Sequence, residues 1–375
     1  MKRPAPLSKL SVPILACLGM IALAAPLIVS AQIGQAEGTV YSLNNAVSGN
    51  RVAVFDRMAD GSLNPARSFA TGGTGTGGGL GNQGALAVSD SGRWLLAVNP
   101  GSDSVSVFLA FGNYLLRTDT EASGGVRPVS VTIEDDVVYV LNAGSDSLQG
   151  FRLSIYGRLT PIAGSQRPLS GVGTAPAQVE FNRDGDLLAV TEKATNKLLT
   201  FPVDADGLLG PVEVQASPAP TPFGFAFGRR DQLFVSEAAG GAPGRSTLSS
   251  YQLRADGRAT LVTAALPSLQ TAACWVVVTR DGRHAFVSNT GSDNLSTYAI
   301  AGGGLSLLNA IAATTGAGSA PTDLALDGNS RYLYSLNPGI GTISAFRVTA
   351  NGSLQLIEHQ AAGFPASAAT GLVAR

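Results

Sequence analysis

Short apolar segments alternate with small polar turns along most of this chain, in a pattern that repeats. In the clearest copies an apolar run ends at Asn, a Gly-Ser-Asp turn follows, and a second apolar run ends in an aromatic residue, as in residues 99–108, 142–151 and 289–298. Apolar runs this short, bounded by Gly, Ser, Asn and Asp, predict β-strands joined by tight turns. We therefore expect an all-β chain built from repeated hairpins.

The closing aromatic residues set the length of the repeat. Seven of them stand 53, 43, 50, 50, 47 and 48 residues apart: Phe55, Phe108, Phe151, Phe201, Tyr251, Tyr298 and Phe346. A period of this size, built from short strands, is typical of the blades of a β-propeller. The sequence thus predicts a seven-bladed β-propeller with four-stranded antiparallel blades.

The two ends of the repeat region predict how the ring closes. Residues 39–44 have the pattern of a second strand, but no inner strand precedes them, and residues 368–374 form an apolar stretch without a partner. We expect this C-terminal segment to supply the inner strand of blade one, because such closure removes a free sheet edge. In blade four we expect strands at 178–181, 187–191, 197–203 and 212–215.

The first 31 residues have the composition of an export signal. Three basic residues precede an apolar stretch over residues 10–29, and Val-Ser-Ala at 29–31 offers small side chains for cleavage. We expect a secreted or periplasmic protein, with one propeller domain over residues 32–375 and no membrane span after cleavage. Residues 14–17, Ile-Leu-Ala-Cys, match a lipoprotein box poorly, so lipidation at Cys17 is kept as an alternative.

Charge and cysteine content exclude several classes of function and site. Removal of residues 1–31, which carry three basic and no acidic side chains, changes the formal net charge from −1 to −4. That balance argues against nucleic-acid binding, which needs a basic surface. Cys274 is then the single cysteine, so no intramolecular disulfide forms, and its apolar neighbours predict a buried thiol rather than a nucleophile. We expect a monomer.

The inner strands predict a first ring of residues around the central tunnel. Aligned strands place one residue of each blade at the same level: Ala85, Ser130, Gln178, Gly224, Trp275, Asp323 and Ser367. From this ring we expect Ser130, Gln178, Trp275 and Asp323 to bind a ligand. Trp275 would provide an apolar stacking wall, with simple packing in the core as the alternative.

A second ring is predicted where the second strands end, at Asn44, Asn99, Asn142, Glu192, Glu237, Asn289 and Asn337. Asn in such turns typically bonds to nearby backbone groups. Glu192 and Glu237 interrupt the Asn pattern on neighbouring blades, and paired carboxylates suit acid–base catalysis or a divalent cation. Solvated turn residues are the alternative.

Arg127 precedes Pro128 and is either a binding group for an anionic ligand or a surface cation. We take Glu192, Glu237 and Arg127 as candidate catalytic residues. We predict no metal site and no cofactor, with a divalent cation as the alternative.

Three other features exclude familiar sites. Residues 71–81 are rich in glycine and contain a formal G-x-G-x-x-G, but no helix follows, which argues against dinucleotide binding and favours a loop that covers or gates a tunnel mouth. Neither His284 nor His359 is expected to face the tunnel, so no histidine-based triad or zinc site is predicted. Arg229-Arg230 is too short a basic run to indicate more than a turn.

The segment Leu-Ala-Val-Asn-Pro-Gly-Ser-Asp-Ser-Val-Ser-Val-Phe, residues 96–108, is similar to the YVTN-type repeat of bacterial propellers. Together with the Arg-Asp-Gly turns at 183–185 and 280–282, it makes the chain resemble the seven-bladed lactonase family, which includes 6-phosphogluconolactonase and carboxymuconate cyclases. The resemblance implies the propeller fold and a ligand surrounded by His, Glu and Arg at the openings of the inner strands. Glu192 and Arg127 are the matching positions, whereas the comparable openings at 127–130, 176–178 and 222–224 contain no His.

Two functions fit these patterns. The first is a secreted lactonase in which water attacks a lactone carbonyl, with Glu192 or Glu237 as the base and Arg127 stabilising the oxyanion. The second, favoured by the missing histidines, is a non-catalytic propeller that binds a small molecule, glycan or protein partner in the cell envelope. A phosphorylated cytosolic sugar lactone is not the expected substrate of an exported protein.

Overall fold

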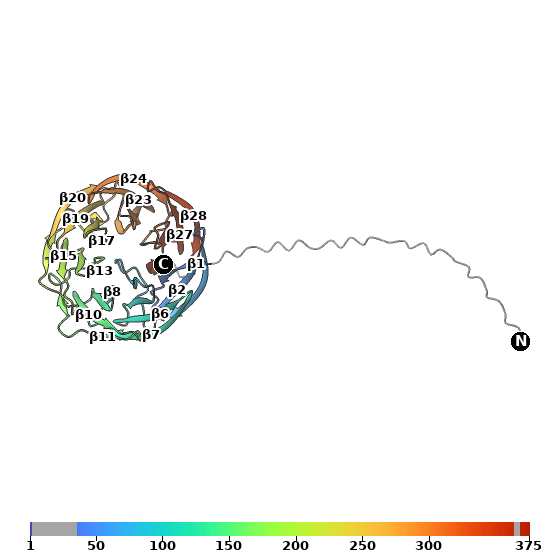
Figure 1. Ribbon diagram of the computed structural model, residues 1–375. Helices are drawn as coiled ribbons and strands as arrows, with labels where there is room; N and C mark the ends of the chain where they lie inside the picture. Colours follow the sequence, from blue (N-terminus) through green and yellow to red (C-terminus); the bar gives the residue numbers. More distant parts are fainter. Residues whose placement is uncertain (2–35, 364–367) are drawn as a thin grey trace. The chain divides into compact units, whose positions relative to one another are not determined.

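The computed structural model describes residues 36–363 and 368–375, together with Met1, and these residues form a ring of seven antiparallel sheets (Figure 1). The expected signal peptide and Cys17 lie outside the described residues. From the hub outward, blade one is β29 (Thr370–Ala374), β1 (Ala36–Leu43), β2 (Arg51–Met58) and β3 (Leu63–Ala70). Blade two is β4 (Leu86–Val88), β5 (Trp94–Asn99), β6 (Ser104–Phe111) and β7 (Tyr114–Ala122).

The next blades follow the same order. Blade three is β8 (Pro128–Glu134), β9 (Val137–Asn142), β10 (Ser147–Leu153), β11 (Leu159–Pro161) and β12 (Arg167–Pro168). Blade four is β13 (Pro176–Phe181), β14 (Leu187–Glu192), β15 (Lys197–Pro202) and β16 (Glu213–Ala216). Blade five is β17 (Pro222–Phe227), β18 (Gln232–Glu237), β19 (Thr247–Leu253) and β20 (Ala259–Pro267).

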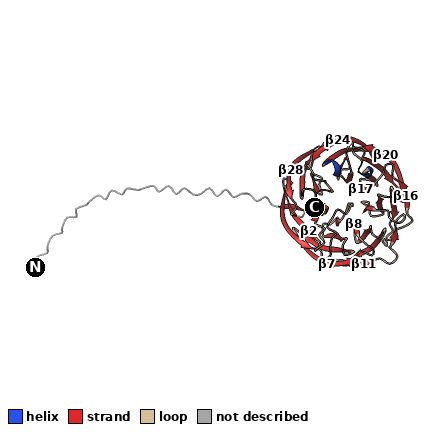
Figure 2. Ribbon diagram, turned by 180° about the vertical axis from the view of Figure 1, so that it is seen from behind, coloured by secondary structure: helices blue, strands red, loops and turns tan. Residues whose placement is uncertain are grey.

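Two blades complete the ring. Blade six is β21 (Ala273–Val278), β22 (His284–Asn289), β23 (Asn294–Ala301) and β24 (Gly304–Thr314). Blade seven is β25 (Asp323–Leu326), β26 (Tyr332–Asn337), β27 (Thr342–Val348) and β28 (Leu354–Ala361). The helical segments of the described residues are the single 3-10 turns η1 (Ala239–Gly241) and η2 (Thr290–Ser292), both far too short to cross a membrane (Figure 2).

The seven-bladed architecture confirms the prediction, and the strand boundaries in blade four agree within two residues. Blade three differs in one respect. Its outer strand is interrupted, because β11 and β12 each pair with a different part of β10. The expected four-stranded blade therefore has its fourth strand in two pieces.

The C-terminal strand closes the ring as predicted. β29 pairs antiparallel with β1, from Val40 opposite Ala374 to Leu43 opposite Thr370. The backbones of Thr39 and Arg375 exchange two further hydrogen bonds of 3.0 and 2.9 Å. Blade one thus combines an inner strand from one end of the chain with three strands from the other, so closure depends on hydrogen bonds between distant segments.

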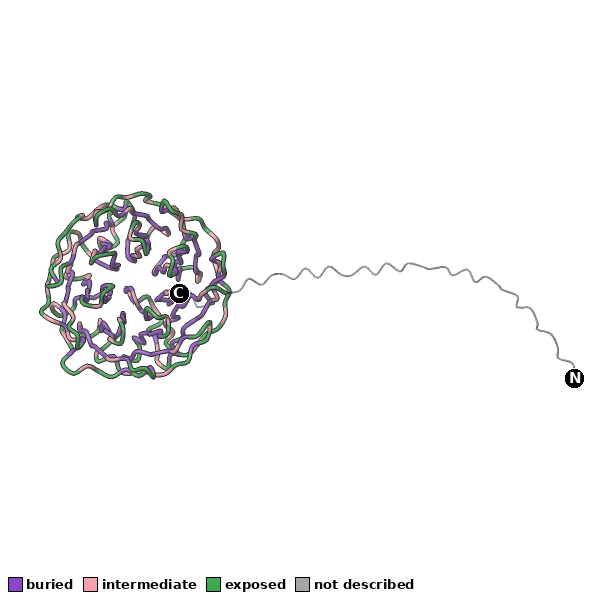
Figure 3. Tube along the Cα trace, viewed as in Figure 1, coloured by how far each residue is buried: buried purple, intermediate pink, exposed green. Residues whose placement is uncertain are grey.

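The core of each blade lies between the inner three strands and the neighbouring blades, while exposed positions gather on the outer strand and in the turns (Figure 3). All seven repeat aromatics are buried, with at most 2% of each side chain exposed. Strands such as β5 and β26 are buried at every residue because both sheet faces are covered. The aromatic spacing in the sequence is therefore the spacing of the blade cores.

The Asp of each Gly-Ser-Asp turn joins its blade to the next one. Asp146 accepts hydrogen bonds from the amides of Gly173 and Thr174 at 2.7 and 3.0 Å, in the loop that leads to β13. Asp293 accepts the amides of Gly318 and Ala320, both at 2.8 Å, before β25. Asp103 bonds in the same way to the Arg127 amide before β8.

These Asp residues also have left-handed backbone conformations, with φ between 46° and 53°. Asp and Asn tolerate that conformation better than most residues do. The repeated motif is thus required both by the turn and by the contact between blades.

Removal of β29 tests ring closure. A chain ending at Gly363 leaves the inner edge of β1 unpaired and exposes the apolar surface that Leu372 covers. We expect its melting temperature, followed by circular dichroism, to fall by about 10 °C or more. A synthetic peptide of residues 368–375 should restore part of the loss in a concentration-dependent way. A melting temperature equal to that of the full chain would contradict closure by β29.

Candidate functional site

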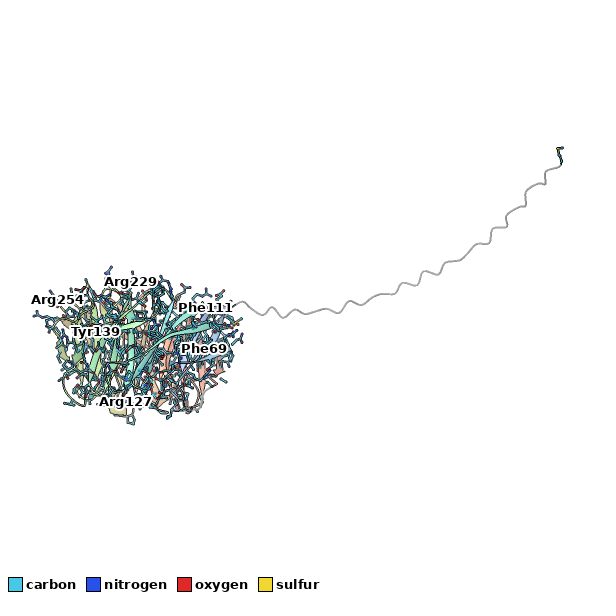
Figure 4. All side chains as sticks on the ribbon, turned by 90° about the horizontal axis from the view of Figure 1, so that it is seen from below. Phe69, Phe111, Arg127, Tyr139, Arg229 and Arg254 are labelled. Atoms are coloured by element: carbon cyan, nitrogen blue, oxygen red, sulfur yellow. The ribbon has the colours of Figure 1, made fainter. Side chains whose placement is uncertain are left out.

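A cavity of about 540 Å³ occupies the hub and is lined by residues of all seven inner strands. The two ends of the hub itself lie on different faces of the propeller. We call the face where the inner strands begin, marked by Arg127 before β8, the entry face. The face where they end, marked by Arg229 after β17, is the exit face. Figure 4 shows Arg127 and Arg229 on opposite sides of the ring.

Polar side chains at the hub satisfy the backbone edges of neighbouring inner strands. Gln178 of β13 accepts the amide of Phe225 at 2.7 Å and donates to its carbonyl at 3.0 Å. Ser130 of β8 accepts the amide of Val179 at 3.1 Å. Both residues were expected to bind ligand, and the structure commits their polar atoms to β17 and β13. Gln178 also lines the hub cavity, whereas Ser130 does not.

The loop that leads from the glycine-rich segment to β4 fills the hub at the entry face. Gln83 accepts the amide of Val276 at 3.2 Å and donates to its carbonyl at 2.9 Å, although blades two and six are not neighbours. The backbone amide of Gln83 donates to the Ala177 carbonyl at 3.0 Å. Gly224 accommodates this arrangement, because a Cβ there would lie 2.1 Å from Oε1 of Gln83. We call residues 80–84 the plug.

Further contacts hold the plug in place. Asn82 donates to the Val129 carbonyl and accepts from the Thr370 hydroxyl at 3.2 Å. The ammonium group of Lys193 donates to the Gly81 carbonyl and lies 4.8 Å from the centre of the Phe223 ring. Burial lowers the pKa of Lys193 to about 8. The glycine-rich segment 71–81 overlaps the plug only at Leu80 and Gly81, so most of the plug lies just after that segment.

Asp323 lies deep in the hub cavity. It is 3% exposed and begins β25, and burial raises its pKa well above the usual range. Hydrogen bonds from the amides of Leu324, Leu372 and Gly371 partly oppose that shift. Asp323 thus combines two roles, since it lines the hub cavity and caps the edge of β29.

Two glutamates on neighbouring strands line the wall of the hub cavity. Glu180 of β13 has a pKa raised to about 8 by burial, opposed by Arg183 and by a 2.7 Å hydrogen bond from Gln178. Glu134 ends β8, and burial together with Asp90 and other nearby carboxylates raises its pKa to about 7. Burial therefore brings the pKa of both carboxyl groups close to neutral, where each can gain or lose a proton. Such a pair can supply an acid and a base.

The sequence analysis missed this glutamate pair, although a signal was available. Alternate residues of a strand share one face. Counting in twos from the predicted hub residues Ser130 and Gln178 leads to Glu134 and Glu180. Arg183, which lines the same cavity just beyond β13, belongs to the Arg-Asp-Gly turn that was interpreted only as a turn.

Glu192 and Glu237 are fully buried, and neither is among the residues that line the hub cavity. Glu192 accepts hydrogen bonds from the amide and hydroxyl of Ser170 at 2.9 and 2.5 Å and from the Thr195 hydroxyl at 2.5 Å. Glu237 accepts the Thr247 hydroxyl at 2.7 Å, and burial raises its pKa to about 7. Both carboxylates are buried and accept hydrogen bonds from residues of neighbouring loops and strands, so the geometry favours a structural role.

Trp275 and Arg127 also lie outside the hub cavity. Trp275 is 5% exposed, and its ring lies 5.0 Å from that of Phe223, in the core beside Cys274. Burial raises the pKa of the Cys274 thiol to about 12, which keeps it protonated, as expected for a thiol in the core. Arg127 is exposed on the entry face, at the end of the hub that the plug fills.

The described residues contain no group of three or more His, Cys, Asp or Glu side chains that could hold a metal ion. His359 accepts or donates at Nδ1 to Ser344 at 2.8 Å in the outer part of blade seven. His284 lies at the start of β22, and burial lowers its pKa. Neither histidine lines the hub cavity.

Comparison with known proteins agrees with this architecture. Residues 245–368 match the family model described as a seven-bladed β-propeller lactonase. No curated protein matches the chain in sequence. The expected resemblance to the lactonase family is confirmed.

Solved structures extend the likeness over the whole propeller. A Lactobacillus plantarum protein is 17% identical with a TM-score of 0.71, covering 90% of this chain and 99% of its own. A 6-phosphogluconolactonase candidate of Bacteroides fragilis is 17% identical with a TM-score of 0.68, covering 90% and 98%. The periplasmic gluconolactonase of Pseudomonas aeruginosa is 18% identical with a TM-score of 0.68, covering 89% and 99%. Likeness at such identities shows the propeller fold and does not identify a substrate.

Replacement of Gln83 by Leu tests the plug. Leu has a similar volume but cannot pair with the amide and carbonyl of Val276, which would be left buried and unsatisfied. We expect the free energy of unfolding in urea to fall by about 1–3 kcal/mol. The matched control Gln355→Leu changes an exposed glutamine on β28 and should alter it by less than about 0.5 kcal/mol. Equal effects of both changes would show that the plug contacts do not stabilise the fold.

Replacement of Glu180 by Gln tests its raised pKa. The native carboxyl keeps its proton up to about pH 8, whereas the unfolded chain releases it near 4.5. Between these values the native state binds more protons, so its stability falls as pH rises. We therefore expect the free energy of unfolding to decrease more steeply between about pH 5 and about pH 8.5 in the wild type than in Glu180→Gln, as measured in urea. Parallel pH profiles would contradict the raised pKa.

Proposed function

We propose that this protein hydrolyses an unphosphorylated lactone in the hub cavity. The observation that carries the proposal is the pair Glu134 and Glu180. They lie on adjacent inner strands, line one cavity, and have pKa values raised to about 7 and about 8. The likeness to gluconolactonase-type propellers supports the same reaction class.

The proposed reaction uses three side chains. Glu134, with the lower pKa, accepts a proton from water as the water oxygen bonds to the lactone carbonyl carbon. Arg183 stabilises the negative charge that develops on the carbonyl oxygen. When the ring C–O bond breaks, the leaving oxygen takes the proton of Glu180. The product is a hydroxy acid, and proton exchange with solvent restores both glutamates.

The charge of the hub cavity argues for an uncharged substrate. Four carboxyl groups line it, from Asp90, Glu134, Glu180 and Asp323, against the single guanidinium of Arg183. A phosphate group would meet repulsion from the ionised members of this set. The proposed export of the protein, based on its first 31 residues, leads to the same substrate class.

A second candidate function is ligand binding without turnover. The plug favours it, because Gln83 and its neighbours fill the entry-face end of the hub, close to the strand openings where the family resemblance implies a site. Glu192 and Arg127, the positions that match the family pattern, lie outside the hub cavity. In this case a lactone or sugar would raise the melting temperature but remain unconverted.

Hydrolysis of D-glucono-1,5-lactone, followed by pH-stat titration with the buffer rate subtracted, separates the two functions. Under the catalytic proposal Glu134→Gln and Glu180→Gln lower kcat/KM by about 100-fold or more. Glu121→Gln on the outer strand β7 is the matched control and leaves the rate unchanged. In the wild type kcat/KM should rise with pH through about 7, as Glu134 loses its proton, and fall above about 8, as Glu180 loses its own.

Other outcomes are equally informative. Loss of activity in Glu192→Gln or Glu237→Gln, with Glu134→Gln and Glu180→Gln active, would restore the assignment made from the sequence and refute the hub pair. Stabilisation by the lactone without conversion would support the binding function. Absence of both across a panel of uncharged lactones would refute both candidates.

A further inference from the structure

Three arginines meet on the exit face, beside the mouth of the hub cavity. Arg183 comes from the turn after β13, and Arg229 and Arg230 come from the turn after β17. With Asn182, Asp184, Phe227, Gly228 and Asp231 they line a separate cleft of about 250 Å³. We call this the arginine cleft. It shares Asn182, Arg183 and Phe227 with the hub cavity, so the two lie side by side.

The guanidinium groups of this cleft differ from those of other arginines on the same face, which have protein partners. Arg283 pairs with Asp281 at 2.7 Å, Arg280 donates to the Gly328 carbonyl, and Arg93 lies over the ring of Trp94. Within the described part of the chain, Arg183, Arg229 and Arg230 form no ion pair within 4.0 Å and no side-chain hydrogen bond. Three unpaired guanidinium groups at one cleft present a set of planar donors for an oxyanion.

Contacts below the surface hold the two turns in place. Asn182 is 1% exposed and donates from its amide nitrogen to Asp231 at 2.8 Å and to Asp186 at 2.6 Å. The stem of Arg229 lies against blade six, since a Cβ at Gly282 would be 3.0 Å from its Cγ and Cδ. The Asn182–Asp231 bond therefore sets the spacing between the two turns before any ligand arrives, which lowers the entropic cost of binding.

The charges of the cleft favour a carboxylate over a phosphate. Two carboxylates, Asp184 and Asp231, line it together with the three arginines, so its formal charge is about +1. One oxygen of Asp231 is occupied by Asn182. A singly charged carboxylate matches this balance, whereas a phosphate dianion would add charge near the acidic wall formed by Glu134 and Asp90.

We infer that the arginine cleft binds the carboxylate of a sugar acid whose uncharged hydroxylated part extends into the hub cavity. Arg229 and Arg230 bind the carboxylate, and Arg183 contributes from the shared wall. The inference concerns binding alone and holds whether or not the hub cavity hydrolyses lactones.

Isothermal titration with gluconate, at low and at high salt, tests this inference. Sorbitol serves as the uncharged probe, and glucose 6-phosphate and inorganic phosphate serve as phosphate probes. In Arg229→Gln/Arg230→Gln we expect the gluconate Kd to rise at least about 10-fold, with sorbitol binding unchanged. The matched control is Arg254→Gln/Arg258→Gln, which removes two exposed arginines from another surface cleft, where Arg258 lies 3.9 Å from Glu213. This control should change the Kd by less than about 2-fold, and high salt should weaken binding to the wild type.

Three results would overturn the inference. One is a wild-type protein that does not bind gluconate, and another is an equal Kd in the wild type and Arg229→Gln/Arg230→Gln. The third is tighter binding of glucose 6-phosphate or inorganic phosphate than of gluconate, which would contradict the assignment of a carboxylate. Because these titrations measure binding without turnover, a failure here leaves the lactone hydrolysis test of Glu134→Gln and Glu180→Gln unaffected.

Discussion

The inner strand of every propeller blade has one edge without a strand partner, and its backbone groups must still form hydrogen bonds away from bulk water. In this ring the side chains of adjacent blades meet that need, as Ser130 does for Val179 and Gln178 for Phe225. Gln83 does the same for Val276 from across the hub. Many polar side chains at the hub therefore stabilise the fold, and only the other polar side chains are available to bind a ligand.

The polar side chains that satisfy no strand edge are unevenly distributed between the two faces. At the entry face the plug occupies the hub, held by Asn82, Gln83 and the Lys193 ammonium group. Towards the exit face the wall carries Glu134 and Glu180, whose carboxyl groups are not needed by any strand edge. Titratable groups that satisfy no strand edge and have shifted pKa values are the best candidates for catalytic residues. The candidate catalytic groups thus lie towards the exit face, opposite the face where the family resemblance implies a site.

The sequence predicted the fold well because the repeat is local. Each blade carries its own aromatic residue and its own turn glycines, and blades two, three and six repeat the Gly-Ser-Asp turn, so the weak signals of the separate repeats reinforce one another. Ring closure by residues 368–374 was predictable because no inner strand precedes residues 39–44 and because residues 368–374 form an apolar stretch without a partner. The candidate site was harder to predict, because Glu134, Glu180 and Arg183 belong to different turns and strands and meet only in three dimensions. Glu192 and Glu237 stood out in the alignment of repeats, but their buried carboxylates accept hydrogen bonds from Ser170, in the loop before β13, and from Thr247 of β19.

The pairing of β29 with β1 has a consequence for how the protein forms in the cell. Because synthesis proceeds from the N-terminus, β1 leaves the ribosome long before its partner exists. Its inner edge stays open while the other six blades are made, and an open edge of this kind is prone to pair with a wrong chain. Biogenesis is therefore most vulnerable in the interval before β29 docks, and a holdase that masks the edge of β1 would act at that moment.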